Sequence, residues 1–235
     1  MRAVNERGAP RAVLFDLDGT LLDTARDLAA ALNRVRMAEG LEALPFTAVR
    51  PFVSHGSFAL TRLGFALADH DAAFEPLRLR LLDEYRACIA DETTPFDGVP
   101  DVLNWLAARA LRWGIVTNKP GWLTTPLMTH ITLPHPPGCV ISGDTLPTRK
   151  PDPAPLLHAA ELLGVAPHEC VYVGDAERDV AAGRRAAMHT LVARYGYLGP
   201  EDTPAAWGAD GEIDSPRALC TWLENRWPEL AAHVP

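Results

Sequence analysis

The sequence predicts an α/β fold: a Rossmann-like parallel sheet flanked by helices, with a mostly helical segment inserted after the first strand. Two patterns predict this architecture. From Pro100 onward, short apolar runs alternate with helical patterns, and such alternation implies right-handed crossovers and a parallel sheet. Residues 24–90, in contrast, carry helical spacing and almost no strand pattern.

The first strand ends on two acids. Val13-Leu14-Phe15 is a short apolar run typical of a strand covered on both faces, and Asp16 and Asp18 follow it directly. Ligands of open α/β sheets gather at the carboxyl ends of such strands. Asp18-Gly19 is also good turn chemistry on its own, so a functional interpretation needs partners elsewhere in the chain.

The segment after these acids is predicted to be a helical insert. Apolar residues recur at helical spacing in two stretches: Leu28, Ala31, Leu32 and Val35, then Leu77, Leu81, Leu82 and Tyr85. The Pro- and Gly-punctuated residues 93–100 are predicted to link the insert to the next helix, with Pro100 in its first turn. We expect an α/β core domain over 1–22 and 96–235 and a helical cap domain over 23–95.

The rest of the chain is predicted to alternate regularly between strands and helices. The expected strands are 112–116, 139–141, 170–173 and 189–192, and the expected helices are 122–130, 153–163, 177–187 and 217–227.

Composition and charge exclude several classes of protein. The 235 residues are 48% hydrophobic and 22% charged, which is ordinary for a globular chain. The net charge of -8 and the absence of Lys/Arg clusters argue against a nucleic-acid surface, because phosphate backbones attract basic residues. No apolar run reaches the roughly 18 to 20 residues that span a bilayer, so we expect no membrane partner.

The N-terminal and cysteine patterns predict a cytoplasmic protein. Residues 1–11 lack the apolar core of a secretory signal. The cysteines are far apart, without Cys-x-x-Cys spacing, and are expected to be reduced thiols: Cys88, Cys139, Cys170 and Cys220. We expect a monomer or a homodimer.

Four polar segments follow the predicted strands, and a parallel sheet would bring them to one edge. They are Asp16/Asp18, Thr117-Asn118-Lys119-Pro120, Lys150-Pro151 and Gly174-Asp175-Ala176-Glu177-Arg178-Asp179. Taken alone, each segment has a structural explanation. A turn explains Asp18-Gly19 equally well, Thr117-Asn118 is more often a helix cap or turn, and Lys150-Pro151 is more often a surface lysine before a helix. Asp175 and Asp179 also suit a helix cap and a solvated helix face. Their joint occurrence in this order favours a shared site.

Phosphoryl transfer requires the chemical groups that these segments supply. A carboxylate can attack phosphorus, and a second carboxyl group can protonate the leaving oxygen and then activate water. Magnesium prefers carboxylate, carbonyl and water oxygens and neutralises phosphate charge. A lysine and a hydroxyl can hold the remaining phosphoryl oxygens.

The segments resemble motifs I to IV of the haloacid dehalogenase (HAD) superfamily, over Ala12 to about Trp227. The resemblance implies that Asp16 is the nucleophile and Asp18 the general acid/base. It also implies that Thr117 and Lys150 act on the phosphoryl group, with Asn118 beside them in the substrate site. The implied cofactor is Mg2+, and the implied ligands are Asp16, Asp18 through its backbone carbonyl, Asp175 and Asp179.

The helical insert looks like the cap of the phosphoglycolate phosphatase-like branch. Such a cap closes over the site and contacts the non-phosphate part of the substrate. The expected substrate-facing loop is Val53-Ser54-His55-Gly56-Ser57, with Ser54, His55 and Gly56 as binding residues. A simple helix-helix turn explains this loop equally well.

Several activities of the superfamily can be weighed against the sequence. Asp18 argues against a dehalogenase, and the absence of lysine from 24 to 97 argues against a phosphonate hydrolase with a cap lysine. Residues 193–202 and 207–210, with Thr117-Asn118-Lys119-Pro120, look like a proteobacterial subgroup. Its members are called phosphoglycolate phosphatases, and some are similar to N-acetylmuramic acid 6-phosphate phosphatases.

We therefore expect an enzyme, a Mg2+-dependent phosphomonoesterase that acts on a small phosphorylated metabolite through an aspartyl-phosphate. The expected substrate is 2-phosphoglycolate or N-acetylmuramic acid 6-phosphate. Two alternatives stay open: a sugar phosphomutase of the same superfamily, and a non-catalytic binding or regulatory protein on the same fold.

Overall fold

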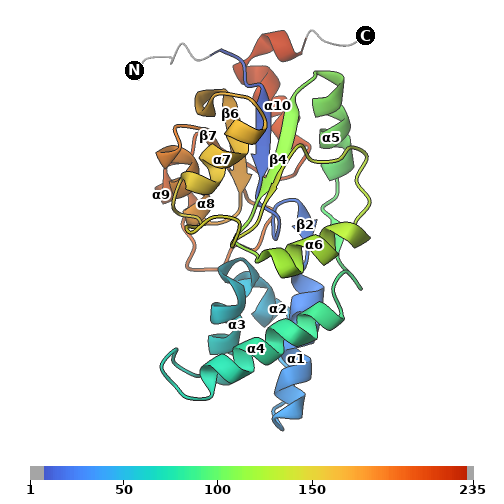
Figure 1. The fold of residues 1–235 in the computed structure, drawn as a ribbon, viewed down its shortest axis with the longest axis vertical. Coiled ribbons are helices and arrows are strands. Elements are labelled where there is room, and N and C mark those ends of the chain that lie inside the picture. Colours follow the sequence, from blue (N-terminus) through green and yellow to red (C-terminus); the bar gives the residue numbers. More distant parts are fainter. Residues whose placement is uncertain (1–7, 232–235) are drawn as a thin grey trace.

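A parallel sheet forms the centre of the computed structural model, which describes residues 8–231 (Figure 1). Within this range the sheet has six strands, and every pair of neighbouring strands is parallel. In spatial order they are β5 (Val140–Ile141), β4 (Arg112–Val116), β1 (Ala12–Phe15), β6 (Cys170–Gly174), β7 (His189–Ala193) and β8 (Gly211–Ile213). The predicted fold class is confirmed.

Helices cover both faces of the sheet because successive side chains of a strand point to opposite faces. In β1, Val13 and Phe15 belong to the core formed with α5 (Val99–Ala108) and α10 (Ala218–Arg226). Ala12 and Leu14 belong to the core formed with α7 (Ala154–Leu162) and α8 (Glu177–Arg185). All of β1 is buried, which explains why its sequence is an uninterrupted apolar run.

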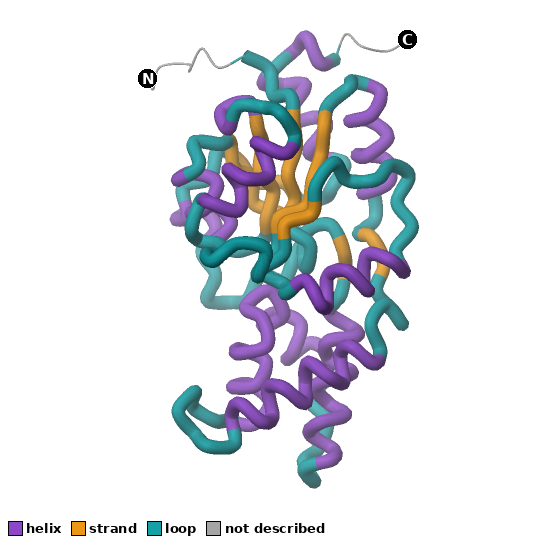
Figure 2. Tube along the Cα trace, in the orientation of Figure 1, coloured by secondary structure: helices purple, strands orange, loops and turns teal. Residues whose placement is uncertain are grey.

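The inserted segment is helical, as predicted. It contains α1 (Ala25–Ala38), α2 (Phe46–Val49), the 3-10 helix η1 (Arg50–His55), α3 (Gly56–Phe65) and α4 (Phe74–Ala87). These helices lie together beyond the edge of the sheet where β4 leads into α6 (Gly121–His130), as Figures 1 and 2 show. The insert therefore faces the carboxyl ends of the strands.

Two short strands carry the chain into and out of the insert. β2 (Leu22–Asp23) pairs antiparallel with β3 (Thr94–Pro95). Asp27, at the start of α1, is buried and accepts hydrogen bonds from the backbone nitrogens of Glu92 and Thr93, at 2.9 and 3.0 Å, and from the Thr93 hydroxyl at 2.6 Å. The predicted domain boundaries fall inside β2 and at the end of β3, and the division into two domains stays a prediction.

Most predicted elements agree with the structure to within one or two residues, and the differences lie in short elements. The sequence did not reveal β2, β3, β8, α9 (Pro204–Trp207), η2 (Pro167–Glu169) or η3 (Pro228–Leu230), because runs of two to four residues are too short to show a period. The four cysteines are free thiols. Among the described residues, no helix is long and apolar enough to cross a membrane.

Candidate active site

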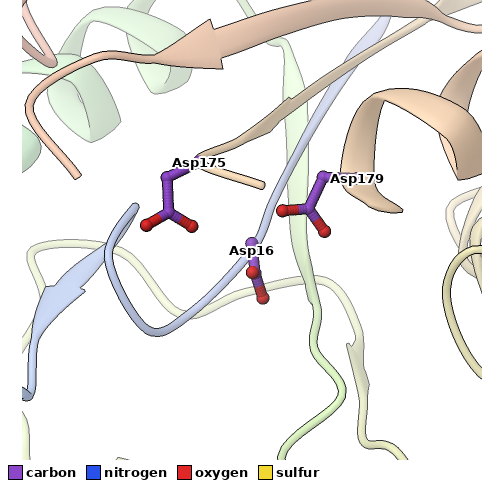
Figure 3. Close-up of side chains that lie close together, drawn as sticks. All are labelled: Asp16, Asp175 and Asp179. Atoms are coloured by element: carbon purple, nitrogen blue, oxygen red, sulfur yellow. The ribbon is translucent and has the colours of Figure 1, made fainter. Parts of the chain in front are cut away.

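Three acids meet at the carboxyl edge of the sheet (Figure 3). Asp16 follows β1, Asp175 follows β6, and Asp179 lies in the first turn of α8. One carboxylate oxygen from each lies within 4.8 Å of the other two, and all three residues are buried. The topology explains this placement, because β1 and β6 are neighbours in register, with Phe15 opposite Val173.

Lys150 is the cation that bridges two of these acids, Asp16 and Asp179. Its side chain is completely buried, and its Nζ lies 2.9 Å from Asp16 Oδ1 and 2.8 Å from Asp179 Oδ1. Nζ also donates to the Val116 carbonyl at 2.9 Å and lies 2.7 Å from the Tyr172 hydroxyl. One buried cation is therefore shared between two carboxylates from different elements.

Asn118 positions the backbone of Lys150. Its amide nitrogen donates to the Lys150 carbonyl at 2.9 Å, and its amide oxygen accepts from the Lys150 nitrogen at 3.0 Å. The structure thus shows a positioning contact for a residue that the sequence suggested as a substrate ligand. Thr117 is buried at the end of β4, where its hydroxyl accepts from the Lys119 nitrogen at 3.1 Å.

The electrostatics of the three acids reflect burial and mutual repulsion. Burial raises the pKa of Asp16 to about 6, with Lys150 opposing this shift and Asp179 adding to it. Burial and the charges of Asp16 and Asp179 raise the pKa of Asp175 to about 7. Burial also acts on Asp179, but the charges of Lys150 and Arg178 outweigh it and hold the pKa of Asp179 below its ordinary value.

The acids have the properties of a cation site. Asp175 Oδ2 accepts hydrogen bonds from the Ser54 hydroxyl at 2.5 Å and from the Tyr197 nitrogen at 2.9 Å. Asp175 Oδ1 is buried and has no hydrogen-bond partner. Buried polar atoms are almost always paired, and carboxylate oxygens are the ligands that Mg2+ prefers. Asp16, Asp175 and Asp179 therefore fit a hard divalent cation.

Asp18 is held beside this cluster by two donors. Its Oδ1 accepts from the Thr24 hydroxyl at 2.6 Å and from Lys119 Nζ at 2.8 Å. Lys119 in turn lies over the ring of Tyr85, a residue of α4, with 4.5 Å between Nζ and the ring centroid. Burial would lower the pKa of Lys119, but Asp18 and Tyr85 outweigh burial and raise it.

Lys119 was not assigned a role from the sequence. It stood inside the segment Thr117-Asn118-Lys119-Pro120, and its pairing with Asp18 spans 101 positions. A signal was nevertheless present: the chain contains two lysines, and the other is Lys150. Apart from histidines, all other basic side chains are arginines. The rarity of lysine could therefore have marked Lys119 as a candidate site residue.

The predicted substrate loop is only partly at the site. Ser54 is buried and reaches Asp175, whereas His55 and Gly56 are exposed. Arg50, the first residue of η1, holds the start of that helix, because its guanidinium donates to the carbonyls of Tyr195 and Gly196 at 3.1 and 3.0 Å. The substrate-binding role of all three loop residues stays a prediction.

Comparison with known proteins shows the family of the chain. Residues 13–193 match the model of the haloacid dehalogenase-like hydrolase family. A phosphoglycolate phosphatase from Xanthomonas campestris pv. campestris is 43% identical over 94% of this chain and 98% of its own. An N-acetylmuramic acid 6-phosphate phosphatase from Pseudomonas aeruginosa is 41% identical over 92% of this chain and 95% of its own.

A solved structure shares the fold. A predicted phosphoglycolate phosphatase from Haemophilus somnus superposes with a TM-score of 0.79 at 24% identity, over 90% of this chain and 97% of that one. The predicted family and the predicted enzyme class, a phosphoric monoester hydrolase, are both confirmed. The chain therefore belongs to the haloacid dehalogenase-like hydrolase family.

Proposed function

We propose that the protein is a Mg2+-dependent phosphomonoesterase that works through a phosphoryl group carried on Asp16. The observation that carries this proposal is the buried cluster of Asp16, Asp175 and Asp179, in which Lys150 pairs with Asp16 and Asp179 and one carboxylate oxygen of Asp175 has no hydrogen-bond partner. The residues would act in two steps.

In the first step, Asp16 attacks phosphorus and the ester P–O bond breaks. Asp18 gives its proton to the leaving oxygen. Lys150, held by Asp16 and Asp179, stabilises the negative charge that develops on the phosphoryl oxygens. A bound Mg2+, held by Asp16, the Asp18 carbonyl, Asp175 and Asp179, would supply further charge neutralisation. Thr117 would add a hydrogen bond to the phosphoryl group.

In the second step, water attacks the phosphorus of the Asp16 acyl phosphate. Asp18 accepts the proton from that water, the bond from phosphorus to the Asp16 carboxylate breaks, and inorganic phosphate leaves. The helical segment 23–95 would act as a cap that excludes bulk water during both steps. A cytoplasmic location and a monomeric or homodimeric state remain part of the proposal.

For the substrate, the contact between Lys119 and Asp18 favours a small anionic phosphoester. The Nζ of Lys119 lies 2.8 Å from the carboxylate that would protonate the ester oxygen. In 2-phosphoglycolate one methylene separates the ester oxygen from the carboxylate, which places that carboxylate within reach of Lys119. In N-acetylmuramic acid 6-phosphate the carboxylate belongs to a lactyl group across the sugar ring.

The second substrate remains a candidate, because the Pseudomonas relative that carries its name is 41% identical. The ratio of kcat/KM for the two compounds, measured with Mg2+ present, decides between them. We expect 2-phosphoglycolate to be preferred, and a preference for the sugar phosphate would assign the chain to the other substrate.

The variant Lys119→Met tests the basis of this choice. Losing one charged hydrogen bond should lower kcat/KM for 2-phosphoglycolate about 10- to 100-fold more than for an aryl phosphate whose leaving group carries no carboxylate. Equal losses on both compounds would show that Lys119 acts on Asp18 alone. A folded protein that releases no phosphate from any of these esters would refute the enzyme proposal and favour a binding protein. Transfer of phosphate to a sugar instead of water would identify a phosphomutase.

A further inference from the structure

We propose that Ser54 is a positioning residue for Asp175, through which docking of the helical insert and binding of the divalent cation favour each other. This inference rests on the cation site proposed above. It concerns a hydrogen bond that a residue of the insert, Ser54, makes to one of the acids of that site, Asp175.

The orientation of the Asp175 carboxylate depends on two donors from different parts of the chain. The Ser54 hydroxyl, from η1, donates to Asp175 Oδ2 at 2.5 Å across 121 positions of sequence. The backbone nitrogen of Tyr197, after β7, donates to the same oxygen at 2.9 Å. Both donors bind Oδ2, and Oδ1 is left without a hydrogen-bond partner. One carboxylate oxygen of Asp175 lies within 4.8 Å of carboxylate oxygens of Asp16 and Asp179 (Figure 3).

The backbone around Ser54 is held by further contacts with helix α8 and with the loop after β7. Arg178, a half-buried residue next to Asp179 in the chain, donates from Nη2 to the Ser54 carbonyl at 2.5 Å. Arg50, at the other end of η1, donates to the carbonyls of Tyr195 and Gly196. Separation of this segment from the sheet would remove the Ser54 hydroxyl from Asp175 and leave the Tyr197 nitrogen as the donor on Oδ2.

Two consequences follow from this arrangement. Hydrogen bonds that orient a metal ligand typically change metal affinity 10- to 100-fold, so the docked insert should bind the cation more tightly than the undocked one. Coupling between two equilibria is reciprocal. The cation should therefore stabilise the docked insert by the same factor.

The test compares cation affinity in the purified full-length protein, measured by titration calorimetry with Mg2+ or Mn2+ as the probe. We expect Ser54→Ala to weaken binding about tenfold and Ser54→Thr, which keeps the hydroxyl, to restore much of the affinity. The matched control is Ser57→Ala. The Ser57 hydroxyl accepts from Arg78 at 3.2 Å elsewhere in the insert, and its loss should leave cation affinity unchanged.

The second readout is amide hydrogen exchange of residues 50–56 with and without the cation. Addition of Mg2+ should slow exchange there in the wild type and less so in Ser54→Ala. If Ser54→Ala binds Mg2+ like the wild type, or if Mg2+ does not change exchange in this segment, the inference is wrong. A wild type that binds Mg2+ and releases phosphate would then leave the proposed function standing. A wild type that binds no Mg2+ would overturn both.

Discussion

The substitution Lys150→Met tests whether one buried cation holds the acids together. The side chain is 0% exposed and its Nζ contacts Asp16 and Asp179 at 2.9 and 2.8 Å. Methionine keeps most of the volume and removes the charge, so two buried carboxylates lose their shared partner. Breaking a buried ion pair in this way costs about 3–5 kcal/mol, and we expect a loss of this size in the free energy of unfolding.

Urea denaturation of the metal-free protein at pH 8 measures this loss. The control is Arg217→Met, which removes ion pairs to Asp97 and Asp101 that are exposed and should change stability little. A second variant locates the cause: Lys150→Met combined with Asp179→Asn should be more stable than Lys150→Met alone, because one uncompensated charge is gone. If Lys150→Met behaves like Arg217→Met, Lys150 does not offset the repulsion between the acids.

Three further substitutions have defined outcomes. Asp16→Asn should lower kcat by about three orders of magnitude or more while the fold and its circular dichroism spectrum stay unchanged, because an amide cannot carry the phosphoryl group; ordinary turnover would remove Asp16 from its role. Gly196→Ala should lower the free energy of unfolding by about 1–3 kcal/mol and remove most of the activity. A Cβ at this position would lie 2.3 Å from Asp175 Cβ and 2.5 Å from the Gly19 carbonyl oxygen. Unchanged stability and activity would show that the surrounding atoms move to accept the methyl group. Asp27→Ala should lower the free energy of unfolding by about 3 kcal/mol, since three donors from Glu92 and Thr93 lose their acceptor, and a much smaller loss would mean that water replaces the carboxylate.

The sequence predicted those parts of the fold whose burial leaves a pattern in a short stretch of residues. Strand β6 (Cys170–Gly174) is apolar throughout because it is buried on both faces, and Asp175 directly after it marks the sheet edge where ligands bind. The edge strand β8 (Gly211–Ile213) has three residues of mixed polarity, and such a short run shows no period.

The parts of the site that the sequence did not predict depend on contacts between distant segments. Ser54 reaches Asp175, and Lys119 reaches Asp18, across more than a hundred positions each. Local spacing carries no information about these pairs, because Ser54 meets Asp175 only when the insert packs against the sheet domain, and Lys119 meets Asp18 only when β1 and β4 lie side by side. Asn118 was placed near the substrate for the same reason, since its hydrogen bonds to the Lys150 backbone come from the fold.

The central claim is that Asp16 carries the phosphoryl group, and chemical trapping tests it most directly. An aspartyl phosphate is reduced by borohydride to homoserine, which peptide mass spectrometry detects at a single position. During turnover of 2-phosphoglycolate or an aryl phosphate with Mg2+, we predict homoserine at position 16 in the wild type and none in Asp16→Asn. Steady phosphate release with no modification at position 16, or modification of Asp18 instead, would contradict the account.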